Sequence, residues 1–166
     1  MATMQDIING FTSPVITPQT IYVTATPRTP APSQGWTPLV IAPCFTADDC
    51  PNAVDLNDLT AYESGESFEV RVPYDAEVKM SNGWVALDDE TLSENLDAME
   101  WVLDVDGVSY YDPAYIYKDT ARMDADDETE YPGAWIAVTL KNFALDEPHV
   151  ITIGYYFKDA VYDGWE

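Results

Sequence analysis

The chain has 166 residues, 30 of them acidic and only 7 basic, which gives a formal net charge of −23. This charge repels phosphate groups and argues against nucleic acid and anionic membrane surfaces as partners. At 46% hydrophobic and 13% aromatic residues the chain can form a core. No stretch approaches the roughly 20 apolar residues of a membrane-spanning helix, so cations, neutral glycans and other proteins remain as partners.

Residues 1–60 are predicted to form an extended arm. Eight prolines occur between Pro14 and Pro51, in a stretch without lysine. Because proline fixes φ and lacks a backbone N–H, the segment 24–35 should be extended and contain no helix. The segment Thr24–Gly35 resembles the Thr/Pro-rich linkers that precede globular modules in bacterial surface proteins.

Two short β-prone runs interrupt the arm, at 21–24 and 39–42. A pure spacer would not need them. We therefore expect parts of the arm to pair with a sheet edge, either in the same chain or in a neighbouring copy. Such an assembly contact would use apolar residues of the arm, namely Val15, Ile16, Ile21, Tyr22 and Val23.

Cys44 and Cys50 are close in sequence and are predicted to close a small disulfide ring, a device of oxidising compartments. The acidic residues and the proline around them favour an exposed loop. Two reduced, buried cysteines are the alternative. A ring this short removes little chain entropy, so the bond would be a local clip that contributes about 2 kcal/mol.

From residue 61 onward the pattern is that of short strands separated by Gly, Pro and Asp turns. The run 67–72 alternates apolar and charged side chains, which indicates a half-buried strand. Asn82–Gly83 and Asp106–Gly107 predict hairpin turns, and 89–99 predicts a short helix. The predicted strands cover 67–74, 77–80, 83–87, 99–105, 108–111, 114–117, 133–140 and 150–157.

Residues 61–166 are thus predicted to form an all-β domain, an antiparallel β-sandwich with one short helical crossover. The order of its elements resembles the immunoglobulin-like β-sandwich modules of secreted bacterial proteins. The Cys…Trp…Cys spacing of antibody domains is absent, because both cysteines precede the domain. The resemblance implies a spacer, an adhesin or a subunit body.

Calcium is the first ligand to consider, because hard cations bind clustered carboxylate and amide oxygens. The best candidate ligands are Asp48, Asp49, Asn52 and Asp55, in and after the cysteine loop, which a disulfide would preorganise. No acidic cluster matches the twelve-residue calcium loop of EF-hands, and a solvated charge run is the alternative.

The 5 tryptophans and 11 tyrosines exceed what a small sandwich core needs. Trp101 and Trp135 lie in strongly apolar runs and are expected in the core. Trp84 follows a predicted turn, and Tyr110 and Tyr111 crowd one hairpin. These three are candidates for stacking on sugars or anchoring a protein interface. The alternative is that tyrosine simply suits half-buried strands.

Catalysis has little support in the sequence. His149 is the single histidine, and the sequence contains no nucleophile elbow with which it could form a Ser-His-Asp arrangement. No glycine-rich phosphate loop occurs either. We expect a non-enzymatic structural module of an extracellular or cell-surface structure, or of a virion, that docks on other copies or another subunit through its arm. A glycan- or protein-binding adhesion module, with or without calcium, is the alternative.

Overall fold

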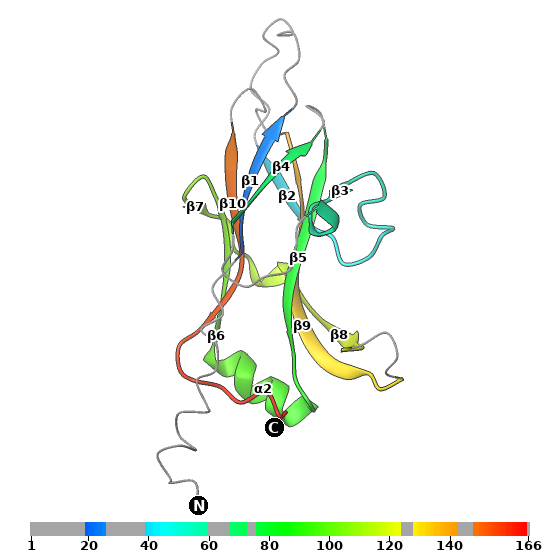
Figure 1. The fold of residues 1–166 in the computed structure, drawn as a ribbon, viewed down its shortest axis with the longest axis vertical. Coiled ribbons are helices and arrows are strands. Elements are labelled where there is room, and N and C mark those ends of the chain that lie inside the picture. The colour runs from blue at the N-terminus through cyan, green and yellow to red at the C-terminus, as the bar shows by residue number, and fades with distance from the viewer. Residues whose placement is uncertain are drawn as a thin grey trace, which may run out of the picture.

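The structure is a computed structural model, and its strands make the fold all-β with a single α-helix among the described elements. Two facing sheets run along the long axis of the molecule (Figure 1). The residues that the structure describes are 19–25, 39–59, 67–72, 76–123, 128–142 and 148–165.

The first sheet, here called sheet A, contains a strand from each end of the sequence. Its strand order is β4-β1-β10-β6-β7. Strand β1 runs antiparallel to β10 and parallel to β4, so it lies inside the sheet. The bounds are β1 (Gln19–Ala25), β4 (Ser67–Val72), β6 (Met99–Val105), β7 (Val108–Ser109) and β10 (His149–Phe157).

The second sheet, sheet B, is centred on the long strand β9. Its order is β2-β9-β5-β3, and β8 also pairs with β9. Strand β2 pairs with β9 at 138–141 and β8 pairs with it at 131–136, so the two follow one another along one side. The bounds are β2 (Val40–Pro43), β3 (Val54–Asp55), β5 (Val78–Val85), β8 (Ile116–Ala121) and β9 (Tyr131–Lys141), with short 3-10 turns at Asn57–Leu59 and Pro113–Tyr115.

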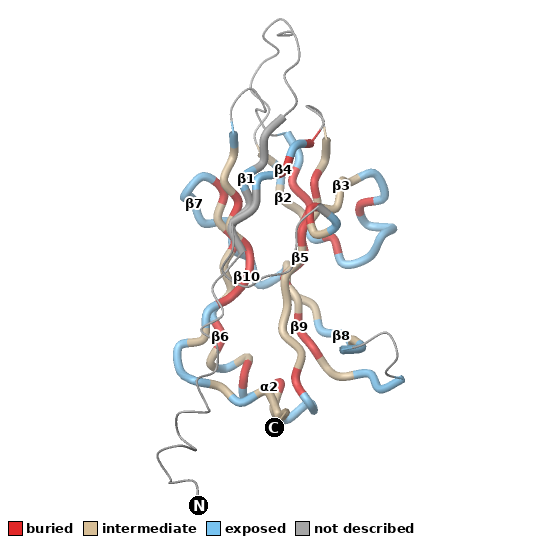
Figure 2. The backbone as a smooth tube through the Cα atoms, in the orientation of Figure 1, coloured by how far each residue is buried: buried red, intermediate tan, exposed pale blue. Residues whose placement is uncertain are grey.

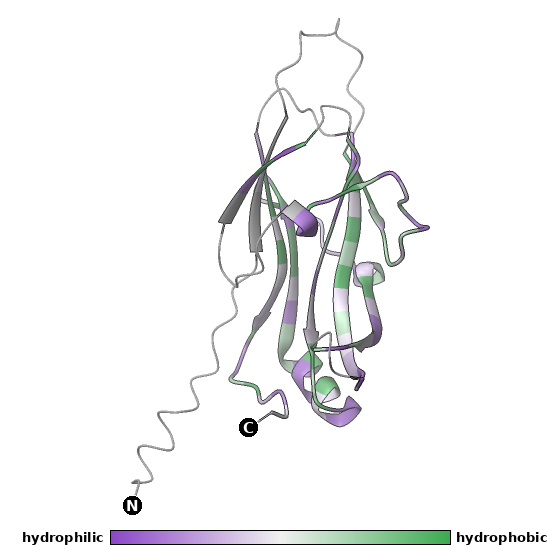
Figure 3. Ribbon diagram, turned by 45° about the vertical axis from the view of Figure 1, so that its right-hand side comes forward, coloured by the Kyte–Doolittle hydropathy of each residue, from purple (hydrophilic) through white to green (hydrophobic). Residues whose placement is uncertain are grey.

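The main core fills the space between the two sheets. Leu103 and Ile151 enter it from sheet A, and Ile136 and Leu140 enter it from sheet B, all with no exposed surface. Leu56 joins them from the segment after β3. Figure 2 shows the buried positions along the facing strands, and Figure 3 shows hydrophobic residues on the same strands. Segments on both sides of residue 60 therefore contribute strands to both sheets.

Of the two predicted hairpin turns, one is confirmed and one is wrong. Asp106 and Gly107 have φ values of 54° and 78° and join β6 to β7. The predicted turn at Asn82–Gly83 does not form, because β5 continues through both residues and pairs with β9. A Cβ on Gly83 would overlap the ring of Trp135, so this glycine allows close packing rather than a turn.

The predicted helix is present as α2 (Asp89–Ala98), and Asp88 caps it. The Asp88 side chain accepts a hydrogen bond of 2.8 Å from the Thr91 backbone N–H. That hydrogen bond, together with one from the Thr91 side chain, lowers the pKa of Asp88 from its ordinary value. The helix places Leu92 against Ala86 and Ala134 in a second, smaller core cluster.

Replacing the cap is expected to destabilise the protein in a pH-dependent way. Asp88→Ala should lower the melting temperature at neutral pH by a few degrees, whereas Asp88→Asn should preserve the cap. Because the folded-state pKa is lowered, the charge-dependent part of the cap is present above the unfolded-state pKa and lost as pH falls through the folded-state value. Thermal unfolding followed by circular dichroism at neutral and strongly acidic pH should show the gap between wild type and Asp88→Ala shrinking in acid. A constant gap would contradict the assignment.

Candidate functional site

Within the predicted arm, β1 is a strand that pairs with two other strands. It pairs with β10 at 5 register positions and with β4 at 6. Ile21 is opposite Ile151, and Val23 is opposite Val70, both partners being buried core residues. Tyr22 is 41% exposed.

Strand β1 is thus paired in its own chain between two strands and not at a sheet edge, whereas β2, from the second predicted run of the arm, lies at an edge of sheet B. Among the described strands, β4 has β1 as its only neighbour, so β1 joins β4 to the rest of sheet A. The other predicted assembly residues, Val15 and Ile16, lie outside the described residues. Of the predicted assembly segments, β1 is therefore the one that the structure describes.

The disulfide loop lies on sheet B. Cys44 and Cys50 are joined by a disulfide, and the Cys44 backbone N–H donates to the Ala137 carbonyl of β9 at 3.2 Å. Inside the loop, the Asp49 carboxylate accepts the backbone N–H groups of Phe45 and Thr46 at 3.0 and 2.8 Å. The hydrogen bonds from Thr46 lower the pKa of Asp49. The loop is therefore held at its ends and across its middle.

The predicted calcium ligands do not converge. Asp48 and Asn52 are exposed, while Asp49 holds the loop backbone. Asp55 binds the Lys79 ammonium at 2.9 Å and accepts the Asn57 backbone N–H at 3.0 Å. Within the described ranges, no three His, Cys, Asp or Glu side chains gather as they would around a metal ion. Calcium binding stays a prediction.

Salt and calcium should separate charge screening from a specific cation site. We expect the melting temperature to rise with NaCl, because screening weakens the self-repulsion of a chain with charge −23. If the loop binds calcium, millimolar CaCl2 at constant ionic strength should raise it further, and Asp48→Asn should remove only that further rise. Differential scanning calorimetry measures both effects. A flat response to both salts would contradict the cation hypothesis.

Two of the three predicted surface aromatics are exposed and one is not. Trp84 of β5 contacts Phe157 and Tyr155 of β10, with ring centroids 4.9 and 6.0 Å apart, so it lies between the sheets. Tyr110 and Tyr111 follow β7 and are each 39% exposed. No ring contact within the described part of the chain joins them to Trp84, so the three do not form one surface.

An aromatic row that the sequence did not predict lies on the outer face of sheet B. Tyr117 of β8 stacks on Trp135 of β9 with centroids 5.6 Å apart and planes 27° apart. Phe45 of the disulfide loop follows on the other side of Tyr117, at 5.0 Å. Trp135 was expected in the core, but its neighbours Ala134 and Ile136 are the residues that point inward.

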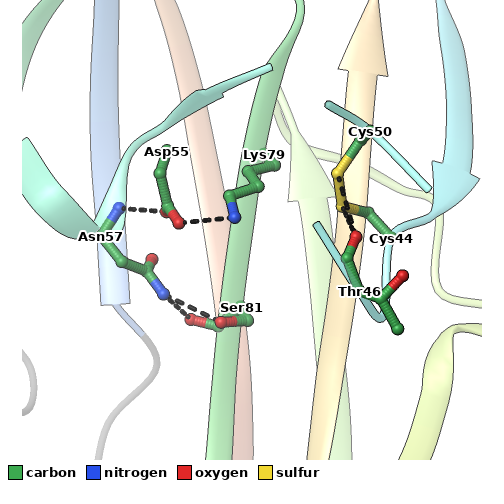
Figure 4. A network of polar contacts seen from close by, with 7 residues as sticks. All are labelled: Cys44, Thr46, Cys50, Asp55, Asn57, Lys79 and Ser81. Carbon is green, nitrogen blue, oxygen red and sulfur yellow. Dashed lines mark hydrogen bonds and ion pairs between the residues drawn. A yellow bond between two sulfur atoms is a disulfide. The ribbon is translucent and has the colours of Figure 1, made fainter. Parts of the chain in front are cut away.

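A cavity of about 160 Å³ adjoins this row. Figure 4 shows the polar groups near it, the Asp55–Lys79 ion pair on one side and the disulfide with Thr46 on the other. Ser81 of β5 accepts a hydrogen bond from the Asn57 side chain at 2.9 Å. The lining combines aromatic and polar side chains: Cys44, Phe45, Thr46, Ala47, Asp55, Lys79, Met80, Ser81, Tyr117 and Ala137.

His149 makes a structural contact with a turn. Its Nδ1 lies 2.7 Å from Asp106 Oδ2, and the other oxygen of that carboxylate accepts the Val150 backbone N–H at 2.9 Å. One carboxylate therefore ties the β6–β7 turn to the start of β10.

In comparisons with known proteins, no family, no curated protein and no solved structure matches this chain. Of the described helices, none is both long and apolar enough to cross a membrane. Two features of the molecule itself bear on its function, namely the two-sided pairing of β1 and the aromatic row on the outer face of sheet B.

Proposed function

We propose that this protein is a non-enzymatic structural subunit of an extracellular or virion assembly, and that copies are joined by exchange of strand β1. In this proposal the body is an immunoglobulin-like sandwich and the N-terminal arm is the connecting element. The observation that carries it is the pairing of β1 with β10 on one side and with β4 on the other.

Strand exchange needs no new chemistry in this fold. If β1 leaves, β10 and β4 both expose backbone N–H and C=O groups, which is an unfavourable state for a sheet interior. A β1 from a neighbouring copy restores the same hydrogen bonds in the same register. Because the donor and the slot are identical in every copy, exchange can close into a dimer or continue into a chain.

The sequence around β1 is compatible with such an exchange. Residues 26–39 separate β1 from β2, and a stretch of that length can reach about 45 Å when extended. This reach exceeds the diameter of a small domain, about 30 Å. Pro18 and Pro27 flank the strand, while no proline occurs within it. They limit the exchanged segment to a defined length, since proline cannot continue a central strand.

Two further features support the proposal, and the first of them favours a location outside the cytosol. The disulfide between Cys44 and Cys50 suits an oxidising compartment, where such bonds persist. The strongly acidic composition keeps a concentrated subunit soluble and limits unspecific association. Neither feature requires a substrate.

Light scattering coupled to gel filtration tests this proposal. Refolded at high concentration, the wild-type chain should form oligomers whose mass increases with concentration. An excess of a synthetic peptide of residues 18–27 should occupy the slots and shift the population toward monomer. The same peptide with Val23→Pro should have no such effect, because proline removes a ladder hydrogen bond. A chain that stays monomeric at every concentration would contradict the proposal. Oligomers whose mass does not change when the peptide is added would contradict it as well.

A further inference from the structure

We propose that the outer face of sheet B binds a neutral sugar ring, with Phe45, Tyr117 and Trp135 as an aromatic platform and the adjoining cavity as the site for its hydroxyl groups. This site is independent of strand exchange, which concerns sheet A. It differs from the surface aromatics that the sequence suggested, because Trp84 lies between the sheets.

Trp135 is held flat against the sheet by two glycines. Gly83 is its register partner on β5, and Gly133 precedes it by two residues on β9. A Cβ at either glycine would overlap the indole ring, at its pyrrole side for Gly83 and at its benzene side for Gly133. With one face of the ring on the backbone, only the other face is left for Tyr117 and for a ligand. The C–H face of a pyranose packs on an aromatic surface of this kind.

Tyr117 and Phe45 extend the platform. Tyr117 stacks on Trp135 with the two ring planes 27° apart, and burial raises the pKa of Tyr117, so its hydroxyl stays protonated and able to donate. Phe45 is 36% exposed although it is fully apolar. The disulfide loop fixes Phe45 there, since its backbone N–H is bonded to Asp49. A fixed, exposed aromatic residue next to a cavity is typical of a binding surface.

The cavity supplies polar groups beside the platform. It is partly open to solvent, and its volume is about 160 Å³. Ser81 Oγ accepts a hydrogen bond from Asn57, which leaves the Ser81 hydroxyl hydrogen able to donate to a ligand. Lys79 and Asp55, both in the cavity lining, form an ion pair, and such a pair can donate to and accept from neighbouring sugar hydroxyls.

The charge of the protein selects against acidic ligands. The net charge is −23, and the only basic residue in the cavity lining, Lys79, is already paired with Asp55. Phosphates, sulfates and sialic acids would meet repulsion without a free cation in the lining to offset it. A neutral hexose or N-acetylhexosamine, as part of a glycan, matches both the aromatic and the polar parts of the site.

Saturation-transfer NMR and calorimetry test the site. The probes are glucose, galactose, mannose and N-acetylglucosamine with their β-linked disaccharides, and sialyllactose as the acidic comparison. We expect at least one neutral sugar to bind with its ring protons in contact with protein. Trp135→Ala should weaken it about tenfold or more, and Trp135→Phe should restore part of the affinity.

Matched variants keep this test specific. Tyr156→Ala removes an exposed aromatic residue on sheet A, away from the platform, and should leave binding unchanged. Gly83→Ala keeps every platform ring but displaces Trp135, and should weaken binding. Circular dichroism and the melting temperature of each variant report whether it is folded. The proposal is overturned if none of the neutral sugars binds, if sialyllactose alone binds, or if folded Trp135→Ala binds as the wild type does.

Discussion

Deletion of residues 1–25 is expected to remove most of the stability of the protein, because it removes a strand from the interior of sheet A. Strand β1 has 5 register positions with β10 and 6 with β4. The backbone hydrogen bonds of this pairing contribute about 1 kcal/mol each to the net stability. Losing all of them approaches the whole free energy of unfolding of a typical domain, about 5–15 kcal/mol. Urea unfolding followed by circular dichroism measures this loss.

Two comparisons make the deletion informative. A chain that lacks only residues 1–17 keeps β1 and should unfold close to the wild type. The chain lacking 1–25 should regain stability when a peptide of residues 18–27 is added, in a concentration-dependent manner. The peptide with Val23→Pro should restore little. If the chain lacking 1–25 is as stable as the wild type, β1 does not stabilise sheet A.

Ile151→Ala is expected to lower the free energy of unfolding by about 2–5 kcal/mol. Ile151 has no exposed surface, and its register partners are Ile21 of β1 and Val105 of β6. Its truncation leaves a cavity under the position where β1 pairs, so the affinity for the peptide of residues 18–27 should fall as well.

Val108→Ala provides the control for that substitution. Val108 is also a β-branched aliphatic residue in sheet A, but it is 54% exposed, and its truncation should change stability by no more than about 0.5 kcal/mol. Equal losses in the two variants, measured by denaturant unfolding with similar slopes, would contradict the position of the core between the two sheets.

Local sequence patterns predicted which segments form strands and turns better than they predicted which strands pair with one another. Alternation in 67–72 and the Asp106–Gly107 turn are properties of neighbouring residues, and both are found in the structure. The prediction of a turn at Asn82–Gly83 was wrong, because both residues pair with β9. Gly83 instead leaves room for the ring of Trp135. Tertiary contacts override a local turn signal when the strand is already paired.

The position of β1 could not be derived from its sequence. The run 21–24 has β propensity, which indicates a strand but does not say which edge or slot it occupies. Its partners lie at 67–72 and 149–153, far along the chain. Such non-local pairing depends on the completed fold.

The aromatic row was hidden for a similar reason. The run 133–140 is almost continuously apolar, so periodicity could not tell which side of β9 faces the core. Phe45, Tyr117 and Trp135 come from a loop and two strands that meet only after folding. The available signal in the sequence was the pair of glycines, Gly83 and Gly133, that leave room for the indole ring.

A cysteine pair across β1 and β10 tests the strand-exchange account most directly. Tyr22 and Val150 are antiparallel register partners, so their Cα atoms lie about 4.5 or 5.5 Å apart, within the range of about 4.4–6.8 Å for a disulfide. Cys44 and Cys50 are bonded to each other and leave no free thiol to interfere. The protein carrying Tyr22→Cys and Val150→Cys is refolded at high concentration, oxidised and separated on a denaturing, non-reducing gel, with each single variant as a control. We predict a ladder of covalent oligomers in the double variant alone, together with a monomer that reduction slows on the gel. A double variant that yields only the internally bonded monomer at every concentration would contradict exchange of β1 between copies.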